Sequence, residues 1–479
     1  MRRFNVIKKH IYPCIPQSTS FHVLSFNVNS GSSEKQTSAN SDSLKQYWLA
    51  VQNYIRSDQY EPAAIPTNPI LESNELEKVP DQSVRTLCEE FIRLDKKGKR
   101  RFFDIMASSY GPNLDKVKER ATQYLESPVE HQYNAYLKLK KVMTPSYEQF
   151  LEHVIKQPNG MKFVIDMRSD LLDTLSEEKS QTLLDLDSSL HEILSNWVSY
   201  SFLEMRELTW DSPSSLLEKI IHYERVHPIA NFESLKQRLT KPRSLYYFSH
   251  PLMPTEPLIF VQVSLQETVP NTMKQIFDNN GGSVAVFYSI SSTQKGLRGI
   301  ELGNFLIKRV VHKLSHESKN IKTFVTLSPI PGFSKWLTSK LHMNVQNGKF
   351  YDDSLLTPSE KDVLGRHPES ALLELLESNR PEELQKLETM MMRLCVRYLY
   401  QEKKRRKALD PVANFHIRNG AQLFRVNWNA DPSSRRYKES YGMMVNYKYD
   451  LDNIESNNRK YLLDDHITAG QSILDIVNK

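Results

Sequence analysis

The chain has 479 residues, of which 39% are hydrophobic and 25% charged, and its formal net charge is +6. This length exceeds what one hydrophobic core usually serves, so two domains are expected, and no stretch approaches the ~20 apolar residues of a membrane-spanning helix. The mild charge comes without a broad basic face or a recognition motif, which argues against a nucleic-acid binder, and three widely spaced cysteines argue against a disulfide scaffold and a structural zinc site.

The N-terminus has the composition of a targeting segment. From Met1 to Ser33 there is no acidic residue, and four basic residues near the start are followed by many Ser, Asn and Thr residues. This pattern is typical of a mitochondrial transit peptide, so we expect residues 1–40 to be a transit peptide and linker that directs the protein to the mitochondrial matrix. The alternative is a disordered basic tail without an address. A second form, cytosolic or peroxisomal, stays open.

The next part of the chain has helical periodicity. Between about residues 43 and 208, apolar residues recur at three- and four-residue spacings, as in the runs 47–54, 87–106, 133–155 and 183–198. Such spacing predicts amphipathic helices and, for residues 41–208, an all-helical bundle of the up-and-down kind. It contains no catalytic constellation. We therefore expect its aromatic residues to form a core and its role to be structural or in assembly.

The pattern then changes to that of a mixed domain. The segments 244–250, 258–265, 284–289 and 323–327 are rich in β-branched and aromatic residues, which predicts strands. An amphipathic helix is predicted from about 299 to 316, between the last two strands. The expected fold class is α+β: the N-terminal helical bundle is followed by an α/β domain over residues 209–479.

A glycine-rich turn precedes this helix. Five of the 15 glycines lie between residues 281 and 303, where the strand ending near Ser289 leads to the helix beginning near Gly299. A helix N-terminus offers free N–H groups and a positive dipole end to a phosphate. The spacing matches neither a Walker loop nor the Rossmann motif, and residues 294–299 only approximate the loop of the N-acetyltransferase superfamily. A pyrophosphate cradle and a purely structural turn both remain open.

Two further residues are weak candidates for a functional role. Ser328 follows a predicted strand and is held by Pro329 and Pro331, so we expect it to be conformationally fixed and exposed. It is not part of a GxSxG elbow, which disfavours serine-hydrolase chemistry. His416 is one of 14 histidines and, by itself, is best interpreted as structural or surface-exposed.

Several long motifs, in order, closely resemble the malonyl-CoA decarboxylase family. They are the segments 287–291, 293–303, 327–333, 393–400, 414–416 and 444–449. The resemblance covers most of the chain from about residue 205 and implies a catalytic domain with the N-acetyltransferase superfamily fold. It also implies conversion of malonyl-CoA to acetyl-CoA and carbon dioxide in the regulation of fatty acid metabolism, without a cofactor or a metal, by a homotetramer.

The resemblance also implies the site residues. It identifies Ser328 and His416 as the catalytic pair, with His416 as the proton donor because a histidine has a reference pKa of ~6.5. Substrate contacts are implied for the following residues: Ser289, Arg298, Gly299, Ile300, Glu301, Leu302, Gly303 and Asn304. Glu301 has a second interpretation, as a carboxylate that interacts with the dipole at the start of a helix.

Two alternatives belong to other functional classes. One is an acyl-CoA N-acyltransferase on the same fold, which would need a cleft for an amine acceptor. The other is a non-catalytic acyl-CoA sensor or helical adaptor, which would have no turnover to lose. An assay of carbon dioxide release against acetyl transfer separates the decarboxylase from the acyltransferase.

Overall fold

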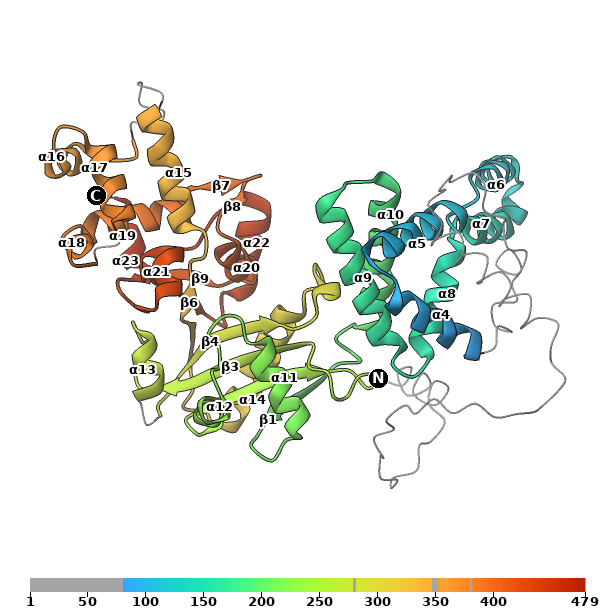
Figure 1. The fold of residues 1–479 in the computed structure, drawn as a ribbon, viewed down its shortest axis with the longest axis horizontal. Coiled ribbons are helices and arrows are strands. Elements are labelled where there is room, and N and C mark those ends of the chain that lie inside the picture. The colour runs from blue at the N-terminus through green and yellow to red at the C-terminus, as the bar shows by residue number, and fades with distance from the viewer. Residues whose placement is uncertain (1–80, 279–280, 347–351, 353, 379–380, 479) are drawn as a thin grey trace.

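The computed structural model describes residues 81–278, 281–346, 352, 354–378 and 381–478 (Figure 1). The predicted transit peptide, residues 1–40, and the first predicted helical run, 47–54, lie outside the described residues. A helical domain is followed by a mixed sheet with helices around it, which confirms the predicted α+β class. None of the described helices combines the length and the apolar character needed to cross a bilayer.

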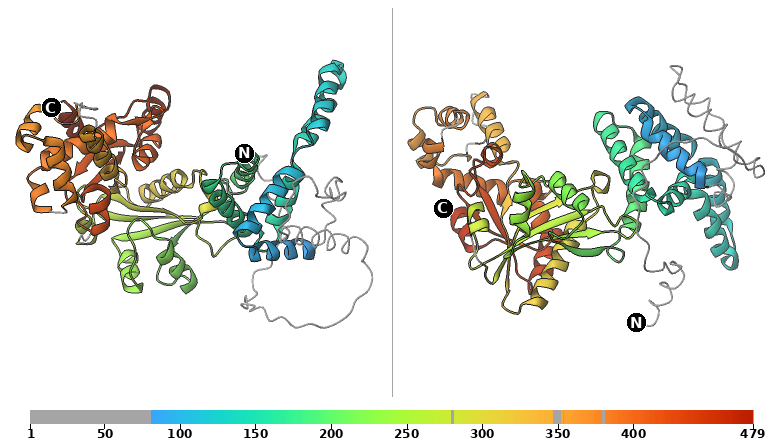
Figure 2. Two further views of the ribbon diagram at one scale, coloured as in Figure 1. Left: turned by 45° about the horizontal axis from the view of Figure 1, so that its top comes forward. Right: turned by 60° about the horizontal axis from the view of Figure 1, so that its bottom comes forward.

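The helical domain confirms the predicted helices. Its elements are α4 (Asp81–Arg93), α5 (Lys96–Ser109), α6 (Leu114–Glu126), α7 (Val129–Met143), α8 (Ser146–Lys156), α9 (Gly160–Glu177) and α10 (Gln181–Trp197). Side-chain caps begin two of them, because Asp95 accepts from the Gly98 N–H and Asn113 accepts from the Lys116 N–H. Buried apolar residues of α5, α8, α9 and α10 form the core, whereas α6 and α7 bury no residue. This hairpin projects from the rest of the domain (Figure 2).

The second domain is built on a mixed sheet. Its strands are β1 (Glu204–Leu208), β2 (Arg243–Ser249), β3 (Ile259–Gln266), β4 (Val284–Ser292), β5 (Thr323–Thr326), β6 (Ser328–Pro329), β9 (Gln422–Asn427) and β10 (Met444–Tyr449). Their order is β1-β2-β3-β4-β5-β10-β6, and β9 pairs with β10. The four predicted strands are present. The strand β1 was not predicted, because this short, charged edge strand falls at the end of the region with helical spacing.

The parallel pair in this sheet creates the site. The helix α14 (Leu302–Glu317) connects β4 to β5, which pair in parallel only up to Phe287 and Thr326. Beyond this point β4 continues to Ser292 paired with β3, while β6 pairs with β10. The two strands therefore lose their mutual hydrogen bonds, and the carboxyl end of β4 separates from β6.

The remaining helices surround the sheet. They are α11 (Ser214–Tyr223), α12 (Phe232–Leu239), α13 (Met273–Asp278), α15 (Phe333–Gln346), α16 (Pro358–Leu364), α17 (Pro368–Glu377), α18 (Pro381–Gln385), α19 (Glu388–Val396), α20 (Pro411–Arg418), α21 (Ser434–Ser440), α22 (Ile454–Asp464) and α23 (Gln471–Val477). Shorter elements are η3 (Lys295–Leu297), η4 (Arg397–Gln401) and the hairpin β7 (Lys403–Lys404) to β8 (Lys407–Ala408). Most helices after α15 lie in a lobe at one end of the sheet (Figure 1), and α20 carries His416.

The helical domain contacts the glycine-rich turn directly. Arg168 of α9, which is 3% exposed, donates hydrogen bonds to the carbonyls of Gly296 (2.7 Å) and Arg298 (3.0 Å). Its guanidinium also pairs with Asp187 at 2.8 Å, and Lys295 pairs with Asp173. The helical domain thereby fixes the backbone that leads into α14.

Candidate active site

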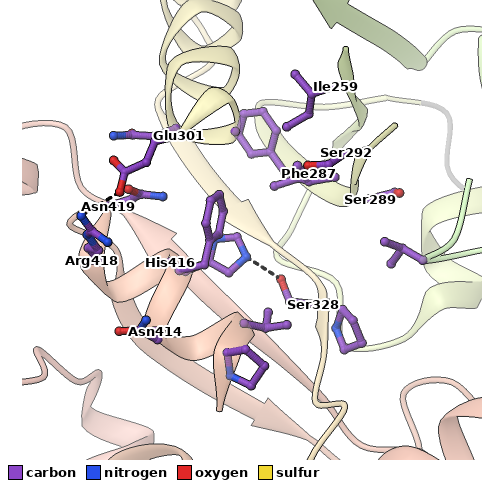
Figure 3. A pocket seen from close by; sticks show the side chains of 18 of the residues that line it. Ile259, Phe287, Ser289, Ser292, Glu301, Ser328, Asn414, His416, Arg418 and Asn419 are labelled. Carbon is purple, nitrogen blue, oxygen red and sulfur yellow. Dashed lines mark hydrogen bonds and ion pairs between the residues drawn. The ribbon is translucent and has the colours of Figure 1, made fainter. Parts of the chain in front are cut away.

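A pocket of about 490 Å³ opens where β4 and β6 separate (Figure 3). One wall is the carboxyl end of β4, and the opposite wall is α20. Residues at the start of α14, β6, Ile259 of β3 and Val226 also line it. The pocket therefore collects segments from widely separated parts of the catalytic domain.

Ser328 and His416 meet in this pocket. The Ser328 Oγ and the His416 Nε2 are 3.2 Å apart (Figure 3). Pairing of β6 with β10 holds Ser328, and Asp410 caps α20 by accepting from the N–H groups of Val412 and Ala413, each at 2.9 Å. The predicted exposure of Ser328 is wrong, since its exposed fraction is 6%. His416 near the end of α20 contacts the serine, and the proline-rich loop could not reveal this contact.

A chain of hydrogen bonds orients the pair. The Tyr449 hydroxyl is 2.8 Å from the His416 Nδ1, and the Ser328 Oγ donates to the Thr326 Oγ1 at 2.9 Å. Burial raises the pKa of Tyr449, so its hydroxyl keeps its proton. When this hydroxyl donates to Nδ1, the imidazole carries its proton on Nε2, which faces the serine. The backbone N–H of Tyr447 donates to the same Thr326 oxygen at 3.1 Å.

The imidazole is uncharged in this environment. Burial lowers the pKa of His416 from 6.5 to about 3. The ring stacks on Tyr447 with a centroid distance of 4.6 Å, and its exposed fraction is 3%. The reference pKa used in the sequence prediction therefore does not apply to this structure, because it assumed a solvated histidine.

The glycine-rich turn brings α14 close to α20. Gly299 has φ of +92°, which favours glycine. A Cβ on Gly303 would lie 2.9 Å from the Phe415 Cζ, so a larger residue there would force the Phe415 ring to shift. Glu301 occupies the N-cap position of α14 but makes no side-chain cap. Its carboxylate instead pairs with Arg418 of α20 at 2.8 Å, across the pocket wall, with both side chains about half exposed (Figure 3).

A second pocket of about 380 Å³ adjoins the first and shares Ser292, Gly299 and Ile300 with it. Its lining includes the cationic residues Arg225, Lys295 and Arg298. Positive side chains beside the start of a helix suit a phosphate group. The shared wall makes the two pockets suitable for the two ends of one long ligand.

The structure brings all the sequence-predicted site residues to these two pockets. The first pocket is lined by Ser289, Gly299, Ile300, Glu301, Gly303, Asn304, Ser328 and His416. Arg298 and Leu302 line the second pocket, together with Gly299 and Ile300. The roles of these residues stay predictions.

Sequence reasoning missed three residues that support the site: Thr326, Tyr449 and Glu224. Thr326 lies two residues before Ser328, and strand alternation would have placed both side chains on one face. Tyr449 belongs to a motif of the resemblance but carried no individual role. Glu224 follows α11 and accepts a hydrogen bond from Ser289 at 2.8 Å. No local pattern indicates this contact, because 65 positions separate the two residues.

Other chemistries find little support in the described part of the chain. No group of three or more His, Cys, Asp or Glu side chains there is arranged to hold a metal ion. Neither pocket is lined by Cys88 or Cys395. Burial raises the pKa of Cys88 to about 12 and that of Cys395 well above its usual value, so both thiols stay protonated.

Comparison with known proteins gives one consistent family. Residues 201–479 match the model of the malonyl-CoA decarboxylase C-terminal domain, and residues 110–198 match that of the N-terminal domain. The mitochondrial malonyl-CoA decarboxylase of Anser anser anser is 36% identical over 444 residues, which cover 87% of each chain. The mitochondrial enzyme of Rattus norvegicus is 35% identical, covering 86% of this chain and 89% of the relative.

Solved structures agree with this result. The malonyl-CoA decarboxylase of Agrobacterium vitis has a TM-score of 0.75 at 29% identity, covering 86% of this chain and 98% of that chain. The enzyme of Rhodopseudomonas palustris has a TM-score of 0.71 at 29% identity, covering 90% and 99% respectively. The likeness thus extends over both domains.

Proposed function

The chain belongs to the malonyl-CoA decarboxylase family, and we propose that it converts malonyl-CoA to acetyl-CoA and carbon dioxide in the pocket between β4, β6 and α20. The observation that carries this proposal is the contact between the Ser328 Oγ and the His416 Nε2 inside the pocket. It supplies a hydroxyl and an imidazole at the same point, next to a second pocket with cationic side chains.

The reaction breaks the bond between the α-carbon and the carboxylate of the malonyl group. The electron pair of this bond moves into the thioester, which becomes an enolate, and carbon dioxide leaves. Since the thioester itself accepts the electron pair, the proposed step uses neither a metal nor an organic cofactor. We assign to Ser328 the role of holding the malonyl group so that the breaking bond stands perpendicular to the thioester plane.

His416 then supplies the proton that the enolate carbon needs. Its imidazole is neutral in this structure, but the malonyl carboxylate brings a negative charge next to it. An opposite charge favours the protonated form, so the pKa of His416 rises when substrate enters. The acquired proton goes to Nδ1, because Nε2 already carries one; the Nε2 proton then moves to the α-carbon, which yields acetyl-CoA and leaves the ring neutral.

The second pocket suits the phosphates of the CoA moiety. Arg225, Lys295 and Arg298 line it, and the N-terminus of α14 lies beside it. The N–H groups of that helix terminus add a positive dipole end. The CoA moiety would thus extend from the second pocket past Ser292 and Gly299 toward Ser328.

The acyl-CoA N-acyltransferase alternative is not favoured, because the relatives over most of the chain are decarboxylases. The two reactions are separated by incubating purified protein with malonyl-CoA, with and without amine acceptors. We expect acetyl-CoA and carbon dioxide to form at the same rate in both cases. Failure of folded protein to release carbon dioxide would refute the proposal.

We infer that the protein forms a homo-oligomer, for which the family resemblance suggests a tetramer. The α6–α7 hairpin supports self-association, because Leu125 is 78% and Val129 is 85% exposed and apolar surface of this kind favours burial against a partner. Val129→Asp should lower the mass measured by light scattering, whereas Lys138→Asp on the same helix should not. An unchanged mass for Val129→Asp would exclude this hairpin from the interface.

We propose the mitochondrial matrix as the location, with residues 1–40 as the transit peptide and linker. Two observations support this: the acid-free composition from Met1 to Ser33 and the mitochondrial names of the goose and rat relatives. A fluorescent protein fused after residue 40 should enter mitochondria. Diffuse fluorescence would contradict the proposal and favour a cytosolic form, and punctate peroxisomal fluorescence would favour a peroxisomal one.

A further inference from the structure

Glu224 is a buried carboxylate at the back of the pocket, with an exposed fraction of 4%. Its Oε1 accepts from the N–H groups of Val226 (2.7 Å) and His227 (2.9 Å) and from the Ser291 Oγ (3.2 Å). Its Oε2 accepts from the Ser289 Oγ at 2.8 Å and from the Gln262 Nε2. No ion pair among the described residues involves it, so hydrogen-bond donors alone compensate its burial.

The groups around Glu224 determine which partner is the donor in each of its hydrogen bonds. The orientation of Gln262 is set by its own oxygen, which accepts from the Tyr288 hydroxyl at 3.0 Å and from Arg238 at 3.2 Å. Its amide nitrogen must therefore face Glu224. With N–H groups on both carboxylate oxygens, Glu224 acts only as an acceptor, and Ser289 must donate its single hydroxyl proton to it.

Because its proton is donated to Glu224, Ser289 has only lone pairs to offer to the pocket that it lines. The malonyl thioester carries a carboxylate and a carbonyl, both of which are acceptors. Neither can form a hydrogen bond with an oxygen whose proton is already committed. The nearest donor in an acyl-CoA is the amide N–H of the cysteamine unit, two carbon atoms beyond the sulfur.

We propose that Glu224 is a positioning residue that turns Ser289 into a hydrogen-bond acceptor for the cysteamine amide N–H of the substrate. This inference rests on the proposed function and extends it, because it identifies which part of the substrate Ser289 recognises. Ser289 is then a binding residue for the arm, and Ser328 with His416 handles the malonyl end.

The placement of Ser289 fits this division. It lies on β4, on the opposite side of the pocket from α20 (Figure 3). Three positions farther along the same strand, Ser292 lines both pockets. A ligand that extends from the Ser328–His416 pair to the cationic pocket therefore passes this part of β4.

The loop after Glu224 is held from a second side. Arg436 of α21, which is 2% exposed, donates to the Val226 carbonyl, and Arg435 donates to the Arg225 carbonyl. The N–H groups of Val226 and His227 are bound to Glu224 itself. Both N–H groups and carbonyl groups of this loop are therefore hydrogen-bonded. These bonds keep Glu224 and Ser289 in fixed positions before substrate binds.

The test compares malonyl-CoA with an otherwise identical CoA analogue that has an ester oxygen in place of the cysteamine amide nitrogen. For the wild-type protein, kcat/KM should be about tenfold higher for malonyl-CoA, the effect of one buried hydrogen bond. Ser289→Ala should bring this ratio to about one. Ser291→Ala removes a hydrogen bond to the same carboxylate from a residue that does not line the pocket, so it should keep the ratio.

Glu224→Gln tests the direction of the proton. The glutamine oxygen is needed by the N–H groups of Val226 and His227, so its amide nitrogen would face Ser289 and donate to it. The same amide nitrogen would also face the Gln262 Nε2, whose hydrogen bond is lost, so a lower melting temperature is expected. The serine proton would then turn into the pocket, and the preference for the amide substrate should disappear. A purely structural role would change stability or kcat without changing this ratio.

The outcomes separate the two proposals. A wild-type protein that does not decarboxylate malonyl-CoA refutes the proposed function. A protein that decarboxylates malonyl-CoA but has a wild-type ratio near one, or keeps the ratio in Ser289→Ala, overturns the inference about Glu224 and Ser289 alone. The Ser289→Ala result decides this even where Glu224→Gln fails to fold, which its thermal melting curve reveals.

Discussion

The two domains bury different kinds of side chain. In the described part of the helical domain, the buried polar or charged residues are Arg168 and Thr174, whereas the second domain buries many, among them Glu224, Ser328 and His416. Buried polar groups destabilise a fold unless they are hydrogen-bonded. Glu224, Ser328 and His416 each have hydrogen-bond partners, and the helical domain instead leaves apolar side chains exposed on α6 and α7. Substitutions in the first domain should therefore change stability or assembly, and substitutions around the pocket should change chemistry.

The largest effect on stability is expected from the helical core. Leu151 of α8 is fully buried, so Leu151→Ala should lower the free energy of unfolding by roughly 2–5 kcal/mol through the cavity that it leaves. The value of kcat per folded molecule should stay unchanged. Denaturant unfolding and a steady-state assay measure both quantities. A lower kcat in the folded variant would contradict the proposal that the helical domain contributes to stability and the pocket to catalysis.

Ser328→Ala should have the opposite profile. Loss of the hydroxyl that positions the malonyl group should reduce kcat by about a hundredfold, while the melting temperature changes little because the cavity is small. The matched control is Ser334→Ala, which removes a partly buried hydroxyl that contacts Tyr441 and does not line the pocket. Equal activity losses in both variants would contradict a specific role for Ser328.

The burial of His416 predicts a dependence of stability on pH. The unfolded chain binds a proton at this residue below pH 6.5, whereas the folded protein binds it only near pH 3. Between these values the unfolded state binds more protons, so stability rises with pH. His416→Gln should reduce this slope by up to about 1.4 kcal/mol per pH unit. Unfolding curves between pH 4 and 7 test this, with the exposed His131→Gln as control; an unaltered slope would argue that His416 is protonated in the folded state.

Tyr449→Phe tests the hydrogen bond that orients His416. It keeps the ring but removes the donor to the His416 Nδ1, so the imidazole can adopt the other tautomer. We expect kcat to fall about tenfold with little change in KM, because one buried hydrogen bond is lost. A variant with wild-type kcat would show that the tautomer of His416 does not depend on Tyr449.

The smallest effect on stability and activity is expected from Glu301 at the wall of the pocket. Glu301→Gln breaks a half-exposed ion pair with Arg418, which should cost less than about 0.5 kcal/mol of stability. A rise of KM for malonyl-CoA by about two- to threefold would then report contact of Glu301 with substrate. An unchanged KM would leave Glu301 with the ion pair as its sole role.

The sequence predicted the elements whose periodicity is local. The helices of the first domain and the strands β2, β3, β4 and β5 each have a clear apolar pattern. The strand β10 was not predicted, although Val445, Tyr447 and Tyr449 alternate with Asn446 and Lys448 in its sequence.

The site was predictable only in part. The resemblance identified Ser328 and His416, which lie 88 positions apart, but the depressed pKa of His416 depends on burial that no segment reveals. Glu224 comes from the loop between α11 and α12 and contacts Ser289 and Gln262 only in the folded protein. Such contacts depend on tertiary packing, and local sequence patterns carry no signal for them.

The most direct test of the proposed chemistry is the rate of acetyl-CoA formation from malonyl-CoA by the His416→Ala variant. If His416 delivers the proton, kcat should fall by about 10²–10⁴-fold in a protein whose melting temperature and oligomeric mass match the wild type. A folded His416→Ala variant that keeps kcat within about twofold of the wild type would contradict this assignment and require a different proton donor in the pocket.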